Sequence, residues 1–387
     1  MLKIGGELYR QDFMEHKFCF IIQRHPLEPL QQVLNSDQTK NPLIEVEDLE
    51  VEFIAGADRL KILEGINFSI QRGEILGLVG ETGCGKSVTA KSLLGLISPK
   101  VSRCKGRIGF NGIDLMRLPE QKLQSIRGAG IAMIFQNPIA SLNPVFTLGE
   151  QIFRLIRMYL SEDIGRLRKE TGLSRRKAIE QIAASRLNAV GLADTKRILH
   201  SYAHENSGGM GQRFRIAMAL VSSPELLIAD EATSALDVTV QAHILNLLTE
   251  ISRNQNMAIL LITHDLGIAA QICDRVAVMY AGRIVEIAGT KELFRSPQHP
   301  YTIGLLNAVP RVGRRQALQQ IPGIIPDLRN PPAGCRFHPR CDKAMDICHI
   351  QRPQDYFSGS RRVACHLYAS GCQGVLVPKN GNGCING

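Results

Sequence analysis

The sequence predicts an α/β fold around a phosphate-binding loop, with an inserted helical subdomain and a loop-rich C-terminal extension. A glycine-rich loop at residues 80–87 lies between a strand-like and a helix-like segment, which is the context that such a loop requires. Short apolar runs typical of buried parallel strands recur along the chain. Within residues 137–222, apolar residues instead recur at a spacing of three and four, as in amphipathic helices.

The length of 387 residues leaves room for about two or three compact units, and 44% hydrophobic residues are ordinary for a globular protein. We expect residues 1–42 to be a poorly ordered extension, or the product of an upstream start codon. Residues 43–296 form the expected nucleotide-binding domain, with the helical subdomain at about 137–222. Residues 297–387 form an expected separate extension, because prolines recur from Pro297 onward.

Apolar runs such as Met257–Ile262 are far shorter than the roughly 18 residues that span a bilayer, so we expect a peripheral membrane role. Phe18–Ile22 is too short for a signal-peptide core, which favours a location inside the cell. A formal charge of +10 and a pI near 9.2 suit nucleic acid, an anionic membrane surface or nucleotide phosphates. A solvated basic surface is the simpler interpretation, because the positive charge is not concentrated in runs.

The expected strands and helices follow from apolar periodicity. Leu43–Phe53 alternates apolar and acidic residues, as a half-buried strand does. Glu74–Val79 predicts a strand that enters the glycine loop, and Ser87–Leu94 predicts the helix that leaves it. Further strands and helices are expected at Ile131–Phe135, Leu226–Ala229, Ala258–Thr263, Leu148–Leu160 and Arg175–Val190.

The glycine loop fits the pattern G-x-x-x-x-G-K-S. Its glycines let backbone N–H groups approach phosphates, and the following helix adds its positive N-terminal end. Lys86 is expected to reach the β- and γ-phosphates of a nucleotide, and the Ser87 hydroxyl to bind Mg²⁺. We interpret Cys84 as a space-filling residue rather than a redox switch. The predicted nucleotide-binding residues of the loop are Gly80, Glu81, Thr82, Gly83, Cys84, Gly85, Lys86 and Ser87.

An acidic pair follows the apolar run Leu226–Ala229. The strand would deliver Asp230 to its end, where the carboxylate can hold the metal through water. Glu231 would then polarise the attacking water. Together with the glycine loop, this pair predicts nucleotide hydrolysis.

Six motifs occur in a fixed order: the glycine loop, Gln136, Ser207-Gly208-Gly209, Asp230-Glu231, Ser234-Ala235-Leu236-Asp237 and His264. Over residues 43–295, this order resembles the nucleotide-binding domain of ABC transporters. The resemblance implies a head-to-tail pair of domains, in which Ser207, Gly208 and Gly209 of one contact the γ-phosphate of ATP held by the other. Glycines at a helix N-terminus also expose N–H donors that suit an anion.

The same resemblance implies further roles. His264 would contact the γ-phosphate, Gln136 would sense Mg²⁺ and the membrane partner, and Asp237 would order the dimer interface. Phe53 is the aromatic residue expected to stack on adenine, although a position in the core is its other interpretation.

Gln136-Asn137-Pro138, Ser141-Leu142-Asn143-Pro144 and His299-Pro300-Tyr301-Thr302 resemble more closely the ATPase subunits of bacterial dipeptide and oligopeptide importers. Their C-terminal extension matches about residues 297–368, and nickel importers belong to the same subfamily. The resemblance implies peptide import at the cytoplasmic face of the inner membrane. The implied partners are a second ATPase subunit, homologous or identical, two permease subunits and a substrate-binding protein, with no nucleic acid.

Two alternatives stay open, and redox sensing through the cysteine cluster stays open as an added function. One is nickel import, and the other is an ABC ATPase acting on ribosomes or DNA. The second class typically carries tandem domains or a coiled-coil insertion, whereas this chain has a single glycine loop and no heptads.

Three residues depart from the family pattern: Asn206, Gly211 and Ala232 stand where Leu or Phe, Arg and Pro are usual. Gly211 within a helix is expected to cost about 1 kcal/mol, and Asn206 is expected to cap that helix. We therefore expect the Ser-Gly-Gly motif to be weaker than usual while hydrolysis around Lys86 survives.

Four of the ten cysteines, Cys335, Cys341, Cys348 and Cys365, have the spacing C-x5-C-x6-C-x16-C. Paired C-x2-C knuckles, which structural zinc sites usually show, are missing from this spacing. Cysteines on irregular loops can hold an iron–sulfur cluster, and these four resemble the [4Fe-4S] ligands of some dipeptide-importer ATPases. Zinc and unligated thiols stay open, and Cys372 and Cys384 are expected to be unligated.

Overall fold

The computed structural model describes residues 41–55, 58–136, 142–232, 237–309, 320–369 and 377–378. The predicted N-terminal extension, up to residue 40, lies outside these ranges. So do Asn137, Pro138, Ser141, Ser234, Ala235, Leu236, Cys372 and Cys384. Among the described helices, none combines the length and the apolar character needed to cross a bilayer.

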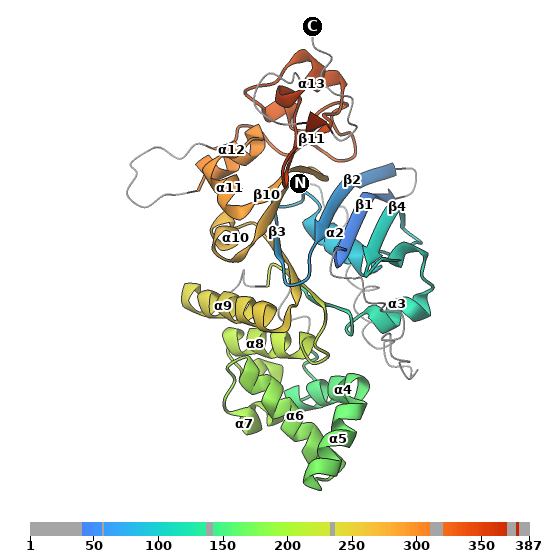
Figure 1. Cartoon of the computed structure of the whole chain (residues 1–387), viewed down its shortest axis with the longest axis vertical. Helices are drawn as coiled ribbons and strands as arrows, with labels where there is room; N and C mark the ends of the chain where they lie inside the picture. The colour runs from blue at the N-terminus through green and yellow to red at the C-terminus, as the bar shows by residue number, and fades with distance from the viewer. Residues whose placement is uncertain are drawn as a thin grey trace.

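The main sheet has the strand order β13-β11-β12-β10-β9-β3-β8-β7-β6. Figure 1 labels β11, β10 and β3 of this sheet. Its parallel part consists of β6 (Ile131–Ile134), β7 (Leu226–Asp230), β8 (Ala258–Thr263), β3 (Ile75–Val79) and β9 (Arg275–Tyr280). The strands predicted within this part are therefore confirmed. Because parallel strands end at the same edge, the residues that follow β3, β6, β7 and β8 gather there.

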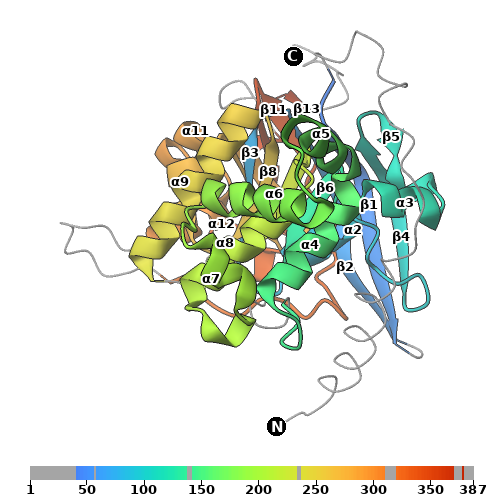
Figure 2. The same ribbon diagram turned by 90° about the horizontal axis from the view of Figure 1, so that it is seen from below.

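The sheet is buried on both faces, which explains its nearly unbroken apolar strands. Ile75 and Val79 of β3 pack in one core cluster with the helices, whereas Leu76 and Leu78 pack in the other. Figure 2 shows β3 and β8 between helices α8 (Gly208–Ala219) and α9 (Val238–Gln255) on one side and a second sheet on the other.

The second sheet is antiparallel, with the order β2-β1-β4-β5. β1 (Ile44–Ala55) confirms the first predicted strand. Its partners β2 (Asp58–Ile70) and β4 (Ser102–Phe110), and β5 (Ile113–Asp114), which pairs with β4, were not predicted. The short helices η3 (Leu115–Arg117) and α3 (Glu120–Ile126) follow β5. Helix α2 (Lys86–Leu93), which confirms the helix predicted after the glycine loop, contributes Ala90 and Leu93 to the core that this sheet covers.

Helices predominate between β6 and β7. The helices predicted at Leu148–Leu160 and Arg175–Val190 are confirmed by α4 (Leu148–Tyr159) and α6 (Arg175–Ala189). They lie at the end of the molecule opposite α13 (Asp346–Ile350) in Figure 1. The other helices in this region are α5 (Ser161–Thr171), α7 (Thr195–His200) and η4 (Ala203–Glu205). Farther along the chain, α10 (Leu266–Ile272) and α11 (Thr290–Arg295) also pack against the main sheet.

The C-terminal extension continues the main sheet instead of standing apart from it. β12 (Arg361–Ala364) pairs antiparallel with β10 (Arg283–Gly289), and β11 (Asp355–Ser358) and β13 (Val377–Pro378) add to it. Pairing satisfies the backbone groups along an edge of β10 that would otherwise be exposed. The remaining elements are α12 (Pro300–Asn307), η5 (His338–Arg340), α13 and η6 (His366–Tyr368).

Candidate nucleotide-binding site and cysteine cluster

The phosphate loop, residues 80–87, joins β3 to α2. Gly80 has φ 155°, and a Cβ atom there would lie 2.1 Å from the carbonyl oxygen of Met279, so glycine is required. The N–H of Gly282 donates to the Cys84 carbonyl at 2.8 Å, which fixes the loop against the turn between β9 and β10.

Lys86 is 5% exposed. Its ammonium donates to the carbonyl oxygens of Gly80 at 2.8 Å and Glu81 at 3.0 Å. At the opposite side of the loop, Thr82 and Gly83 are exposed. Burial raises the pKa of Cys84, which keeps this thiol protonated and unreactive.

Ser87 and Asp230 meet where α2 begins and β7 ends. The Ser87 hydroxyl donates to Oδ1 of Asp230 at 3.1 Å. Asp230 is 2% exposed, and burial raises its pKa. A hydroxyl and a carboxylate side by side are hard oxygen ligands of the kind that Mg²⁺ prefers, so these residues fit the ion.

Glu231 lies between two of the other predicted site residues. Gln136 Nε2 donates to one carboxylate oxygen of Glu231 at 2.6 Å, and Nδ1 of His264 lies 3.2 Å from the other. Glu231 itself has a left-handed backbone (φ 48°), and its N–H donates to the carbonyl of Ile262 at 3.0 Å. Three segments distant in sequence thus place an acid, an amide and an imidazole within direct contact.

The Ser-Gly-Gly turn (Ser207, Gly208 and Gly209) begins α8. Ser207 is the N-cap, and its hydroxyl accepts from the N–H of Met210 at 3.3 Å. Ser207 and Gly208 are exposed, and a Cβ atom on Gly208 would meet no atom within 4 Å. The start of α8 therefore lies at the surface, where the first N–H groups of a helix have no partner within the helix.

The prediction that Asn206 caps α8 is wrong. Asn206 precedes the cap, and its amide donates to the Ser201 hydroxyl and to the Tyr202 carbonyl, each at 2.8 Å. Since Ser207 has extended dihedral angles and reaches Met210, it takes the capping position instead.

Helix α8 is tied to the residues around Glu231 and to α9. The amide of the buried Gln212 donates to the carbonyl of Ala232, the residue after Glu231. A Cβ atom on Gly209 would lie 3.0 Å from Cγ1 of Val240, in the first turn of α9. The turn is thus closely packed on one side and open on the other.

Asp237 and Phe53 lie outside the contacts around Glu231. Asp237 is the N-cap of α9 and accepts from the N–H of Val240 at 2.9 Å. Phe53, near the end of β1, is partly buried and packs against the core that the antiparallel sheet covers. Its surroundings match the alternative interpretation as a core residue.

The four predicted cysteine ligands surround one cavity. Its lining includes Cys335, Cys341, Cys348 and Cys365, and all four are free thiols. Burial raises the pKa of Cys335 and Cys341, and that of Cys365 to about 12. Among the described residues, no group of three or more His, Cys, Asp or Glu is arranged to hold a metal ion.

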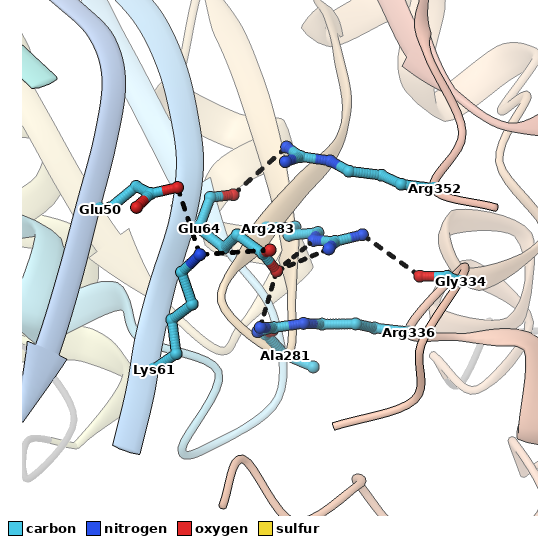
Figure 3. A network of polar contacts seen from close by, with 8 residues as sticks. All are labelled: Glu50, Lys61, Glu64, Ala281, Arg283, Gly334, Arg336 and Arg352. Carbon is cyan, nitrogen blue, oxygen red and sulfur yellow. Dashed lines mark hydrogen bonds and ion pairs between the residues drawn. The ribbon is translucent and has the colours of Figure 1, made fainter. Parts of the chain in front are cut away.

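Arg283, Arg336 and Arg352 form an arginine cluster around Glu64, which joins the C-terminal extension to the antiparallel sheet (Figure 3). The three arginines line one cavity together with Cys335. The carboxylate of Glu64, on β2, forms ion pairs with Arg283 at 2.5 Å and with Arg336 at 2.8 Å. Burial opposes ionisation of Glu64, but the pairing with Arg283 and Arg336 holds its pKa at about 2. Arg352 donates to the Glu64 carbonyl at 3.3 Å.

Sequence reasoning missed two partners of the phosphate loop. Arg340 forms an ion pair with Glu81 at 2.8 Å, and the Tyr301 hydroxyl accepts from the N–H of Glu81 at 3.1 Å. Tyr301 belongs to the His-Pro-Tyr-Thr motif, which was noticed, but no local signal connects either residue with a loop more than 200 positions away.

Comparisons with known proteins agree with this architecture. Residues 63–234 match the family described as ABC transporter, and residues 285–348 match the family described as oligopeptide/dipeptide transporter, C-terminal region. The second match falls on the part of the chain that contains Arg336, Arg340 and three of the cysteines.

Similar proteins align over nearly their whole length. The oligopeptide transport ATP-binding protein OppD of Salmonella typhimurium is 46% identical, over 85% of this chain and 94% of that protein. The dipeptide transport ATP-binding protein DppD of Bacillus subtilis is 45% identical, over 84% and 94%. Among solved structures, cbiO1 of Clostridium perfringens, part of the ABC transporter complex cbiONQ, has 27% identity and a TM-score of 0.53 over 66% of this chain and 92% of its own.

Proposed function

This chain belongs to the ATP-binding subunits of ABC transporters, and we propose that it hydrolyses ATP to drive the import of peptides. The observation that supports this most is the contact of Gln136 and His264 with Glu231, directly beside the pair formed by Ser87 and Asp230. The peptide substrate is supported by the similar oligopeptide and dipeptide transport ATP-binding proteins, and by the match of residues 285–348 to the oligopeptide/dipeptide transporter C-terminal region.

In the proposed mechanism, ATP lies along the phosphate loop, with its phosphates at the loop N–H groups and the start of α2. Lys86 exchanges the carbonyl oxygens of Gly80 and Glu81 for the β- and γ-phosphates. Ser87, Asp230 and Gln136 would hold Mg²⁺, which when bound neutralises phosphate charge.

Glu231 is the proposed residue that orients and polarises the attacking water. Its two partners hold each carboxylate oxygen in place, so the group needs little reorganisation. We propose that His264, which the same interaction holds at Glu231, contacts the γ-phosphate. We assign Gln136 a further role in sensing the membrane partner, as the family resemblance implies.

A second copy or a related subunit would complete the site. The N–H groups of Ser207, Gly208 and Gly209, at the start of α8, suit the γ-phosphate of ATP held by the partner. Asp237, by capping α9 next to this turn, would order the interface. Phe53 remains our proposed adenine contact.

We place the assembled complex at the cytoplasmic face of the membrane, with two permeases, a second ATPase subunit and a substrate-binding protein. Purification of the chain with two permeases, together with ATP turnover stimulated by a peptide-loaded binding protein, would support this. Stimulation by nickel instead of peptide would favour the nickel importer. Retention on ribosomes or DNA without permeases would contradict both.

We further propose that Cys335, Cys341, Cys348 and Cys365 hold a [4Fe-4S] cluster. Their convergence on one cavity supports this, although their arrangement in the structure is not one that holds a metal ion. The anaerobically purified protein should contain iron and absorb light at about 400 nm. Cys348→Ser should lose both properties, and the control variant Cys104→Ser should keep them. Stoichiometric zinc, or no metal, would contradict the cluster.

A further inference from the structure

Glu81, the second residue of the phosphate loop, is held by the C-terminal extension through two separate groups. Arg340 donates to Oε2 at 2.8 Å and to Oε1 at 3.1 Å, which makes a two-pronged ion pair. The Tyr301 hydroxyl accepts from the backbone N–H of Glu81 at 3.1 Å. One contact fixes the side chain of Glu81, and the other fixes its backbone.

The backbone carbonyl of Glu81 faces Lys86, the lysine expected to bind the nucleotide phosphates. Its carbonyl oxygen accepts from Lys86 at 3.0 Å, next to the Gly80 carbonyl at 2.8 Å. The C-terminal extension therefore contacts Glu81, the same residue whose carbonyl oxygen accepts from the Lys86 ammonium. A shift of Glu81 would move the oxygen that sets the position of Lys86 before it turns to phosphate.

Arg340 is itself rigidly placed. Its side chain is 5% exposed, and Nε donates to the Pro322 carbonyl at 2.8 Å. Its guanidinium lies over the Tyr280 ring at 5.8 Å. Burial opposes its charge, but the hydrogen bonds to Glu81 and Tyr280 raise its pKa, so it stays charged. A bidentate pair with so little freedom fixes direction as well as distance.

Tyr301 is equally constrained. It is fully buried, and its ring packs against Tyr280 at 4.6 Å and Phe337 at 5.4 Å between centroids. The N–H of Tyr301 donates to Nδ1 of His299 at 3.0 Å. Burial lowers the pKa of His299 to about 3, so this nitrogen stays an acceptor. The hydroxyl that meets Glu81 thus has a fixed position.

Arg336, in the segment 335–341, makes a second connection between the extension and the residues that contact the phosphate loop. Arg336 donates to the carbonyl of Ala281 and pairs with Glu64 (Figure 3). Ala281 precedes Gly282, whose N–H holds the Cys84 carbonyl. Arg336 and Arg340 each adjoin a cysteine of the cavity, Cys335 and Cys341.

We propose that Arg340 and Tyr301 are positioning residues for ATP binding, through which the C-terminal extension sets the conformation of the phosphate loop at Glu81. This rests on the proposed ATP site at that loop. Neither residue touches the expected phosphate positions of the loop. Their effect is on affinity for ATP, more than on the chemical step at Glu231.

The test uses the full chain in its assembled transporter, with ATP affinity measured by calorimetry in a Glu231→Gln background to stop turnover. Arg340→Gln should weaken ATP binding about tenfold, and Arg340→Lys less, because Lys keeps the charge and one hydrogen bond. Tyr301→Phe, which keeps the ring and changes no charge, should weaken it about threefold. The matched control is Arg329→Gln, which removes an exposed arginine of the extension that pairs with Asp327.

In the hydrolysing background, KM for ATP should rise with these variants while kcat at saturating ATP stays within about threefold. If Arg340→Gln and Tyr301→Phe bind ATP like Arg329→Gln, the proposal is wrong. If only Arg340→Gln weakens binding, Arg340 acts through charge alone and positioning is also refuted. The proposed function fails separately, if the unaltered complex hydrolyses no ATP.

Discussion

The two halves of the nucleotide machinery differ in how their groups are held within one chain. In the loop half, which comprises residues 80–87 with Gln136, Asp230, Glu231 and His264, side chains already contact one another. In the turn half, the Ser-Gly-Gly turn, Ser207 and Gly208 are exposed. One half is organised by its own chain, and the other presents donors outward.

This difference has a physical origin. The loop half lies at the carboxyl edge of a parallel sheet, where buried strands β7 and β8 fix the backbone that carries Asp230, Glu231 and His264. The turn half lies at the start of α8 and depends on a cap and two glycines. Changes to the loop half should therefore abolish ATP binding or hydrolysis. Changes to the turn half should instead weaken assembly and ATP turnover, and lower stability modestly.

The largest expected effect is on Glu231. Glu231→Gln should lower ATP turnover of the assembled transporter by about 100-fold or more, because the amide cannot accept a proton from water. ATP binding should persist. The control is Glu250→Gln, an exposed carboxylate on α9 that should turn over normally. Equal turnover of the two variants would remove Glu231 from the mechanism.

Outside the loop half, the largest expected effect on the free energy of unfolding comes from substitution of Glu64. Glu64→Gln should lower the free energy of unfolding by about 2 kcal/mol at pH 7, because Arg283 and Arg336 lose their partly buried carboxylate partner. Glu47→Gln, at an exposed pair with Arg107, should change it by less than about 0.5 kcal/mol. Urea unfolding measures both.

The pH dependence of this effect has a defined sign. The folded-state pKa of Glu64, about 2, lies below the ordinary value of 4.5 for this side chain. The stabilisation is therefore complete above about pH 4.5 and declines as the pH falls toward 2. A difference between Glu64→Gln and the unaltered protein that grows on acidification would contradict the ion-pair explanation.

Ser207→Ala should cost about 1 kcal/mol of stability, because the N–H of Met210 loses its partner. Ser174→Ala removes a similar cap, at the start of α6, and should cost a comparable amount. Only Ser207→Ala should also lower ATP turnover of the assembled complex. If the two serine variants lose turnover alike, the turn half has no role beyond capping.

The smallest effect concerns Gly211. Gly211→Ala should raise the free energy of unfolding by up to about 1 kcal/mol, because a Cβ atom there meets nothing within 4 Å. Gly209→Ala should give no such gain, since its Cβ atom would lie 3.0 Å from Val240. Thermal unfolding of the pair tests whether Gly211 weakens this turn, and equal stabilities would argue against it.

Local patterns predicted much of the loop half. The glycine loop requires a strand before it and a helix after it, so β3 and α2 followed from the motif alone. The apolar run of β7 likewise predicted where Asp230 and Glu231 would emerge. Gln136 and His264 were named only through family resemblance, and the structure shows why they belong together: their strands end at one edge.

Strand pairings and ion pairs between residues far apart in the chain were not predictable from the sequence. β2 and β4 pair with β1 through contacts that no local period encodes. The pairing of β12 with β10, and the ion pair of Arg340 with Glu81, join residues far apart in sequence. The capping residue of α8 failed for a different reason: Asn206 and Ser207 are both good caps, and only the backbone angles select between them.

The central claim is that one chain binds ATP through its loop half, while its turn half serves a partner. The most direct test is the ATP affinity of the purified chain carrying Lys86→Ala or Ser207→Ala, together with turnover in the assembled transporter. We predict that Lys86→Ala loses ATP binding, whereas Ser207→Ala binds ATP normally and loses only turnover. Loss of ATP binding by the Ser207→Ala chain alone would contradict this division.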